Sequence, residues 1–213
     1  MSREEGAAQV DWVDIASAVL LALATVATAW SGYQASRWNG EQAKAAARAN
    51  AARIESTRAS GLANAQTQVD VATFIAWADA YAHEDARLTD FYFDRFRKEF
   101  KPAVEAWAAT RPLKNPKAPL TPFAMPEYRL AEQTKADILQ KESERYAAGA
   151  RAYIQRSTNY VLGVVLFATA LFFAGMSAKL PSRRIRIVLL GLGVAVFVGA
   201  IAWIASSPVS VSV

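Results

Sequence analysis

The chain contains no cysteine and only one histidine among its 213 residues. The absence of cysteine excludes disulfide bonds and thiolate metal sites, although it does not indicate a cellular compartment. The single histidine, His83, argues against a helical di-metal carboxylate centre, because such a centre normally takes a histidine from each of two helices. We therefore expect no metal and no cofactor.

Proline is absent from residues 1–101, whereas six of the eight prolines lie between Pro102 and Pro126. Because proline ends or kinks helices, the first region is free to form long helices, and residues 102–126 are predicted to be an extended connector with polyproline character. Pro126 is expected to open the next helix, since proline is tolerated in the first helical turn.

Two features are expected inside this connector. Residues 103–110 are predicted to form a short helix, and the apolar side chains of Leu120, Phe123 and Met125 are expected to pack on the helical domain. The alternative is that the prolines form a recognition motif for a proline-binding domain.

Charged residues are absent from three long stretches, which are residues 15–36, 157–178 and 187–213. Each is long enough to cross a hydrocarbon core of about 30 Å as a helix. A buried helix of a soluble protein would explain one such stretch, but three in one chain favour a membrane protein. We therefore predict transmembrane helices over residues 11–36, 158–178 and 187–206.

The predicted fold class is an all-α membrane protein with three transmembrane helices. An extramembrane helical bundle, residues 37–157, is inserted between spans one and two. Polar tails are expected at residues 1–10 and 207–213, and a basic loop is expected at residues 179–186.

The two long helical regions have very different lengths, which constrains how they pack. Antiparallel helices that start from the same membrane and pack throughout must be of similar length. The proline-free first region is much longer than the helix that leads into span two, so we predict that it folds back near Gly61. The expected bundle helices are residues 34–59, 66–101 and 127–157; one straight projecting helix is the alternative.

An alanine-rich stretch follows the first span. Trp38, Gln42, Ala45, Ala49 and Ala52 alternate at spacings of four and three residues, which is typical of a coiled-coil seam. Either this helix packs very closely on a neighbour through its alanines, or it is a solvated stalk. A larger apolar face follows after Gly61 and predicts a buried core, formed by Val71, Phe74, Ala78, Tyr81, Leu88, Tyr92, Phe96 and Phe100.

Small residues recur along the predicted spans. Ala24, Thr28 and Gly32 share one face of span one, and Gly191, Ala195 and Gly199 share one face of span three. Such faces let helix backbones approach closely in lipid. We expect self-association through them, with the alanine faces of residues 42–52 of neighbouring subunits also meeting outside the bilayer; the alternative is that the small residues pack only the spans of a single chain.

Four basic residues crowd the short loop between spans two and three, namely Lys179, Arg183, Arg184 and Arg186. Short basic loops stay cytoplasmic, so the domain is predicted to be extracytoplasmic, on a bacterial cytoplasmic (inner) membrane. The opposing evidence is that basic residues also flank the domain's own membrane junctions, while Asp11 and Asp14 precede span one. The loop residues could also contact lipid headgroups.

Residues with catalytic potential are few. Asp79 and His83 share one helix face and could supply two metal ligands, but an ion-paired, solvated face that also contains Glu84, Asp85 and Arg87 is the simpler interpretation. No phosphate-binding loop, nucleophile elbow or metalloprotease motif is present. We therefore expect no catalytic, cofactor-binding or metal-binding residues.

Four segments of the sequence carry a resemblance: ATAWSGYQASRW, FYFDRFRKEFKPAVEAW, APLTPFAMPEY and NYVLGVVLFATALFFAG. Their combination resembles a family of uncharacterised bacterial three-span membrane proteins, and the resemblance covers nearly the whole chain. It implies a bacterial membrane origin. Because that family has no assigned activity, it implies no site residues.

The function expected from these features is that of a non-enzymatic membrane scaffold or interaction subunit, which is oligomeric. Its partners would be the lipid bilayer and either further copies of itself or a larger membrane-protein complex, and not nucleic acid. The alternative is a pore-forming homo-oligomer lined by span one, whose mildly polar residues are Ser17, Thr25, Thr28 and Ser31. An enzyme would rest only on the residues around His83.

Overall fold

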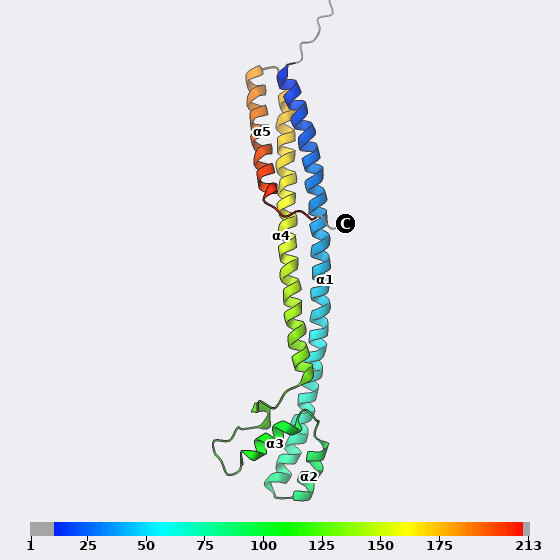
Figure 1. The fold of residues 1–213 in the computed structure, drawn as a ribbon, viewed down its shortest axis with the longest axis vertical. Helices are drawn as coiled ribbons and strands as arrows, with labels where there is room; N and C mark the ends of the chain where they lie inside the picture. The colour runs from blue at the N-terminus through cyan, green and yellow to red at the C-terminus, as the bar shows by residue number, and fades with distance from the viewer. Residues whose placement is uncertain (1–10, 211–213) are drawn as a thin grey trace, which may run out of the picture. The chain divides into compact units, whose positions relative to one another are not determined.

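The computed structural model describes residues 11–210, and within them the regular elements are all helices (Figure 1). The α-helices are α1 (Trp12–Ala82), α2 (Ala86–Arg95), α3 (Lys101–Ala109), α4 (Ala131–Lys179) and α5 (Arg183–Ala205), and a short 3-10 helix, η1, spans Pro122–Ala124. The predicted all-α fold is confirmed, with small helices between the first and second long apolar helices. The tail predicted at residues 1–10 and the last three residues of the other tail lie outside the described residues.

The chain divides into two compact units. The first, here called the membrane unit, consists of Met1–Ala46 and Ala147–Val213; the second, the connector unit, consists of Ala47–Tyr146. Helices α1 and α4 each contribute to both units.

In the membrane unit, α1, α4 and α5 lie side by side (Figure 1). Each contains a window that is long and apolar enough to cross a bilayer, with mean hydropathies of 1.8, 2.2 and 2.7 respectively. These three candidate spans suggest a multi-pass membrane protein that contacts the lipid bilayer. Spans of this kind are helical because the hydrocarbon core offers no hydrogen-bond partner to an exposed backbone.

Glycine allows two close contacts between the helices of the membrane unit. A Cβ placed on Gly163 of α4 would lie 2.2 Å from Ile204 Cδ1 of α5, and a Cβ on Gly193 of α5 would lie 3.2 Å from Leu20 Cδ2 of α1. Both glycines are therefore contact points between neighbouring spans. Neither belongs to the small-residue faces that the sequence pattern singled out.

The segment after α5 is fixed to the other two helices of the membrane unit. The buried Gln34 side chain of α1 accepts a hydrogen bond from Ser210 N at 3.0 Å and donates one to Ser210 O at 3.4 Å. The hydroxyl of Tyr160, on α4, donates to Pro208 O at 3.3 Å. This double attachment satisfies a glutamine that is fully buried between helices.

The predicted reversal near Gly61 is wrong, because α1 is continuous from Trp12 to Ala82 and Gly61 lies inside it. The predicted helix 66–101 is correspondingly divided into the end of α1, all of α2 and a short irregular link before α3. The alternative of a single continuous helix is the one observed. Within the connector unit, α2, α3 and the connector cover the final part of α1 (Figure 1). The part of α1 that extends beyond the start of α4 is therefore still packed.

A seam of small residues joins α1 and α4 in the connector unit. Ala49 and Ser56 of α1 are buried, as are Ser143 and Ala136 of α4. Ser143 Oγ donates to Ala49 O at 2.9 Å, and Ser56 Oγ donates to Ala136 O at 2.8 Å. A step of seven residues forward on α1 thus matches seven residues backward on α4, which is the register of an antiparallel coiled coil.

The alanine-rich helix is therefore closely packed on a neighbouring helix, as one of the two interpretations expected, but its partner is α4 of the same chain and not the alanine face of another subunit. Trp38, Ala45, Ala49 and Ala52 are buried, and Gln42 is half-buried. The seam also extends further than expected: serine hydroxyls that bond across to a main-chain carbonyl occupy positions where a larger side chain would separate the helices.

The aromatic core lies in the connector unit, between α1, α3 and the connector. Phe74, Trp77, Phe96, Phe100 and Trp107 form its buried centre. As expected, Phe123 and Met125 pack against it, and a short helix, α3, carries Trp107.

Four details of this region differ from expectation. Leu120 is 93 % exposed rather than packed, and Val71, predicted to lie in the core, is 37 % exposed and does not belong to it. Leu88 is 42 % exposed, because it lies on α2 and not on a continuation of the α1 face. Helix α4 begins at Ala131 rather than at Pro126. The intervening residues supply Tyr128 and Leu130 to the interior instead.

Candidate functional site

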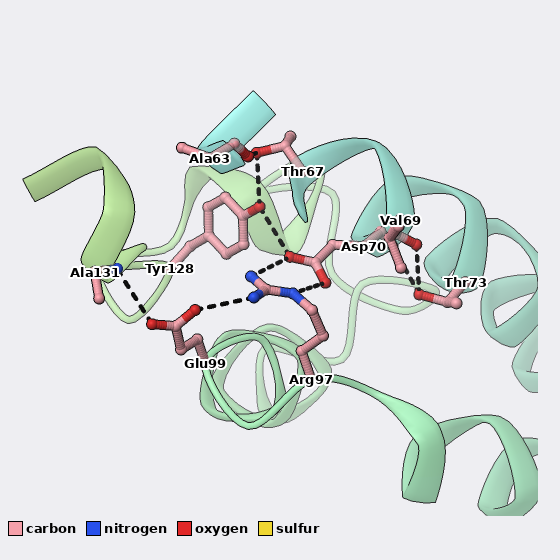
Figure 2. A network of polar contacts seen from close by, with 9 residues as sticks. All are labelled: Ala63, Thr67, Val69, Asp70, Thr73, Arg97, Glu99, Tyr128 and Ala131. Atoms are coloured by element: carbon pink, nitrogen blue, oxygen red, sulfur yellow. Dashed lines mark hydrogen bonds and ion pairs between the residues drawn. The ribbon is translucent and has the colours of Figure 1, made fainter. Parts of the chain in front are cut away.

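The most distinctive polar site is a network in the connector unit, centred on Asp70 (Figure 2). Asp70 lies on α1 and is completely buried. Arg97, from the link between α2 and α3, grips it with two hydrogen bonds, Nε to Oδ1 at 2.9 Å and Nη2 to Oδ2 at 3.1 Å. Such a two-pronged pair matches the planar guanidinium to the carboxylate.

Tyr128 and Glu99 complete the network. The Tyr128 hydroxyl lies 3.1 Å from Asp70 Oδ2 and 3.2 Å from Thr67 Oγ1. Glu99 accepts a hydrogen bond from Arg97 Nη1 at 3.0 Å and another from the main-chain N of Ala131, the first residue of α4, at 3.2 Å. Figure 2 shows these side chains converging from three separate parts of the chain.

The electrostatics of the network follow from these contacts. The hydrogen bonds to Asp70 are the main reason that the pKa of the Arg97 guanidinium is raised above its usual value. Burial is the main reason that the pKa of the Tyr128 phenol is raised. Both side chains therefore keep the protonated forms that donate to Asp70.

The chemistry available to this network is structural. Both carboxylate oxygens of Asp70 are already hydrogen-bonded, and the guanidinium of Arg97 is shared between Asp70 and Glu99. Within residues 11–210 no group of three or more His, Asp or Glu side chains could hold a metal ion. The network fastens the residues that flank the connector, Arg97 and Tyr128, to α1, and through Glu99 it also holds the start of α4.

Sequence reasoning missed this network, although one signal for it exists. Ser56, Ala63, Asp70 and Trp77 follow one another at seven-residue intervals and are all buried. An acidic residue in line with alanine, serine and tryptophan on a seam indicates a buried carboxylate, which needs a basic partner.

The residues around His83 are solvated. His83 Nδ1 lies 3.6 Å from Asp79 Oδ1, and both side chains are 76 % exposed. Asp85 caps α2 by accepting a hydrogen bond from Leu88 N at 3.0 Å. An exposed pair and a helix cap are ordinary surface features.

The small residues predicted to mediate packing are distributed over different environments. Ala24 is fully buried in the membrane unit and Thr28 is half-buried, with its hydroxyl donating to Ala24 O at 2.7 Å. Gly32, Gly191, Ala195 and Gly199 are exposed on the single chain. A Cβ on any of these three glycines would meet no other atom within 4 Å.

The predicted basic residues of the short loop also differ among themselves. Lys179, Arg183 and Arg184 are exposed. Arg186 is the exception, because its guanidinium pairs with Asp14 and lies 3.5 Å from Asp11 Oδ2, both at the start of α1.

Arg186 also binds the end of α4. Its Nε donates to Ser177 O at 3.0 Å, while the Ser177 hydroxyl donates to Arg186 O at 2.9 Å. One side chain thus joins the start of α1, the end of α4 and the first turn of α5. The acidic residues that precede span one therefore have a structural partner.

The mildly polar residues of span one differ in their exposure. Ser17 and Ser31 are buried, whereas Thr25 is exposed and its hydroxyl donates to Leu21 O at 2.7 Å. Thr28 likewise bonds within its own helix, as described above.

Comparisons with known proteins add no relative: no family model, no curated protein and no solved structure matches this chain. The geometry itself shows helices joined by small-residue seams, a satisfied polar network and three apolar helices of membrane-spanning length. The chain is accordingly described here as an all-α protein with three candidate transmembrane helices, which suggest a multi-pass membrane protein in contact with lipid.

Proposed function

We propose that the protein is a non-enzymatic membrane scaffold that works as a homo-oligomer. The observation that supports this proposal is an exposed apolar stripe on α1 in the connector unit. Its large members are Ile54, Leu62 and Val69, which are 63 %, 50 % and 52 % exposed. The exposed alanines Ala47, Ala51, Ala65 and Ala72 continue the stripe at spacings of three or four residues.

This stripe, here called the outer stripe, is separate from the seam that faces α4. The seam residues Ala52, Ser56, Ala59 and Ala63 are buried, so α1 has apolar residues on two sides while α4 occupies only one. A helix with a second, unoccupied apolar side is typical of one that packs against a further helix. Arg58 interrupts the stripe and is paired with Glu55 at 3.2 Å.

The partner that fits this surface best is a second copy of the chain. Copies inserted in one bilayer share the same orientation, so their α1 helices run parallel. A two-fold axis between parallel helices brings each residue beside its own counterpart. The small residues exposed in the membrane unit, among them Gly32, would let the spans approach in the same way.

The absence of native cysteine makes a direct test simple. We expect a single Leu62→Cys variant, in native membranes under mild oxidation, to form a disulfide-linked dimer, because the two sulfurs would meet across the axis. Asn64→Cys is the matched control: it is exposed on the opposite flank of the same turn and should stay monomeric. Failure of Ile54→Cys, Leu62→Cys and Val69→Cys to cross-link, with a monomeric mass in nanodiscs, would refute the oligomer.

We propose the bacterial cytoplasmic (inner) membrane as the location, with the connector unit on the extracytoplasmic side. The exposed basic residues Lys179, Arg183 and Arg184 support this orientation, because short basic loops are retained in the cytoplasm. Asp11 and Asp14, which precede span one, pair with Arg186 at the short loop. These acidic residues are therefore compatible with the proposed orientation.

A further inference from the structure

A lipid-facing groove of about 330 Å³ lies in the membrane unit, between α1, α4 and α5. Helix α1 contributes Leu23, Val26, Ala27, Trp30 and Ser31 to its lining; Phe167 comes from α4, and Phe197, Ile201 and Ile204 come from α5. Apart from the Ser31 hydroxyl and the Trp30 indole N–H, the lining side chains are purely hydrocarbon. If α1, α4 and α5 cross the bilayer, as their hydropathy suggests, a groove in this position opens to lipid and not to water.

The single hydroxyl of the groove has no hydrogen-bond partner within the described residues. Ser31 is completely buried, and its Oγ neither donates nor accepts a hydrogen bond. Other hydroxyls on the same helix are satisfied: Thr25 and Thr28 donate to carbonyls of their own helix. Because buried polar groups are almost always paired, an unpaired hydroxyl beside a groove points to a partner supplied by a bound molecule.

The depth of Ser31 indicates which part of a lipid it would meet. Ser31 precedes Arg37, the first charged residue after the span, by six residues, which is about 9 Å along a helix. Trp30 and Tyr33, whose ring centroids are 6.0 Å apart, mark the interfacial level beside it. The groove extends inward from there to Leu23, about 12 Å deeper.

We propose that this groove holds one acyl chain of a membrane glycerolipid, whose ester carbonyl accepts a hydrogen bond from the Ser31 hydroxyl. The ester lies just inside the headgroup layer, at the level of Ser31, and the chain runs inward toward Leu23. Ile204 lines the groove and also covers Gly163, where a Cβ would lie 3.6 Å from Ser31 Oγ. Because Ser31 is completely buried in the single chain, the proposal requires the Ile204 side chain to rotate so that the hydroxyl meets the lipid.

Burial of the chain alone does not select a lipid, because the surrounding tails are as apolar as the groove. Retention therefore depends on the fit of the groove and on the Ser31 hydrogen bond. This inference is independent of self-association, since it concerns residues of a single chain, and it stands or falls separately from the outer stripe.

Lipid retention by the full-length protein tests the proposal. Protein purified in mild detergent is incubated with a diester phosphatidylglycerol, and bound lipid is counted by native mass spectrometry during stepwise delipidation. We expect one lipid to persist on the wild type and Ser31→Ala to lose it at least threefold more readily. Ser17→Ala is the matched control, because Ser17 is also buried on α1 but has a partner in Ser177 Oγ at 3.4 Å and does not line the groove.

Two further measurements separate the proposal from its rivals. A diether lipid of the same chain length and headgroup lacks the carbonyl, so it should be retained as poorly by the wild type as the diester is by Ser31→Ala. Equal retention of the diether and diester lipids would overturn the role of Ser31. A photoreactive residue at Val26 should label lipid; labelling of a second copy of the chain instead would show that the groove is a helix-docking surface.

Discussion

Asp70 occupies a seam position where α1 otherwise places alanine or serine, and the consequence is a completely buried carboxylate. A buried charge is tolerated only when it is paired and hydrogen-bonded. Arg97 and Tyr128 meet that need and, in doing so, determine where the connector returns to α1. Asp70, an unusual residue for such a seam, thus determines where Arg97 and Tyr128 pack against α1.

Replacing this carboxylate should loosen the connector unit. We expect Asp70→Ala to destabilise it by about 3 kcal/mol, because the Arg97 guanidinium, which is 26 % exposed, would remain largely desolvated without its main partner. Hydrogen–deuterium exchange of the full chain in detergent should show faster exchange over residues 97–131. Asp90→Asn, at an exposed position on α2, is the control; an equal change in both variants would contradict the structural role of the network.

The Tyr128 phenol should make the connector unit sensitive to alkaline pH. Its pKa is raised above the usual value of 10.0, mainly by burial. Below about pH 10 the phenol is protonated in the folded and unfolded states, so its contribution is fully present. Above that pH the unfolded phenol ionises first, so stability falls as the pH rises toward the folded pKa.

The predicted loss of stability with rising pH can be checked by thermal unfolding between pH 9 and 11. Wild type should lose stability over this range more steeply than Tyr128→Phe, which has no phenol to ionise. Tyr146→Phe, outside the network, should keep the wild-type slope. Parallel curves for wild type and Tyr128→Phe would show that burial of this phenol has no thermodynamic effect.

Replacement of glycine by leucine should change the stability of the membrane unit at Gly163 of α4 but not at Gly191 of α5. Gly163→Leu should destabilise the membrane unit by roughly 1–3 kcal/mol, because its side chain would need the space that Ile204 fills. A Cβ on Gly191 would meet nothing within 4 Å beyond its own helical turn, so Gly191→Leu should leave the thermal stability of a monomer in detergent unchanged. A cross-linking defect of Gly191→Leu in membranes, without loss of stability, would place span three in the subunit contact.

At the scale of the helices, the continuity of α1 through Gly61 is the feature most directly open to measurement. Spin labels at Ala51 and Ile75 lie at exposed positions 24 residues apart. A continuous helix predicts a separation of about 36 Å at 1.5 Å per residue. Pulsed electron spin resonance on the doubly labelled chain measures it; a distance below about 20 Å would require the turn that the structure lacks.

The three apolar helices were predictable from sequence because the length of an uncharged run is set by the thickness of the bilayer. The seam was predictable in part, because the alternating spacing of four and three residues around Ala49 can be read directly from the sequence. The reversal at Gly61 was not correctly predicted, because the length argument considered only α1 and α4. It ignored that α2, α3 and the connector could pack on the part of α1 that α4 does not reach.

The polar network was beyond the sequence argument for a related reason. Asp70, Arg97 and Tyr128 are brought together by tertiary packing across separations of 27 and 58 residues. No local spacing rule connects residues so far apart. Only the anomaly of a carboxylate on a seam could have suggested that a partner exists, and it could not have identified Arg97 among the basic residues of the chain.

At the scale of the whole molecule, the orientation in the membrane is the property on which the biological setting depends. With the connector unit extracytoplasmic, alkaline phosphatase inserted at the exposed Asn115 should be active, and a green fluorescent reporter there should be dark. A reporter fused after residue 182, between α4 and α5, should give the reverse pattern. Inactive phosphatase together with a bright fluorophore at Asn115 would invert the topology.

The pairing of Arg186 with Asp14 joins residues 172 positions apart in the chain. A ribosome that adds about 5–20 residues per second makes Asp14 roughly 10–30 s before Arg186. During that interval Asp11 and Asp14 lack the arginine with which they pair in the complete chain. We therefore expect α5 to be the last of the three apolar helices to join the membrane unit, and a chain that ends before it to lack the Arg186 partner of Asp11 and Asp14.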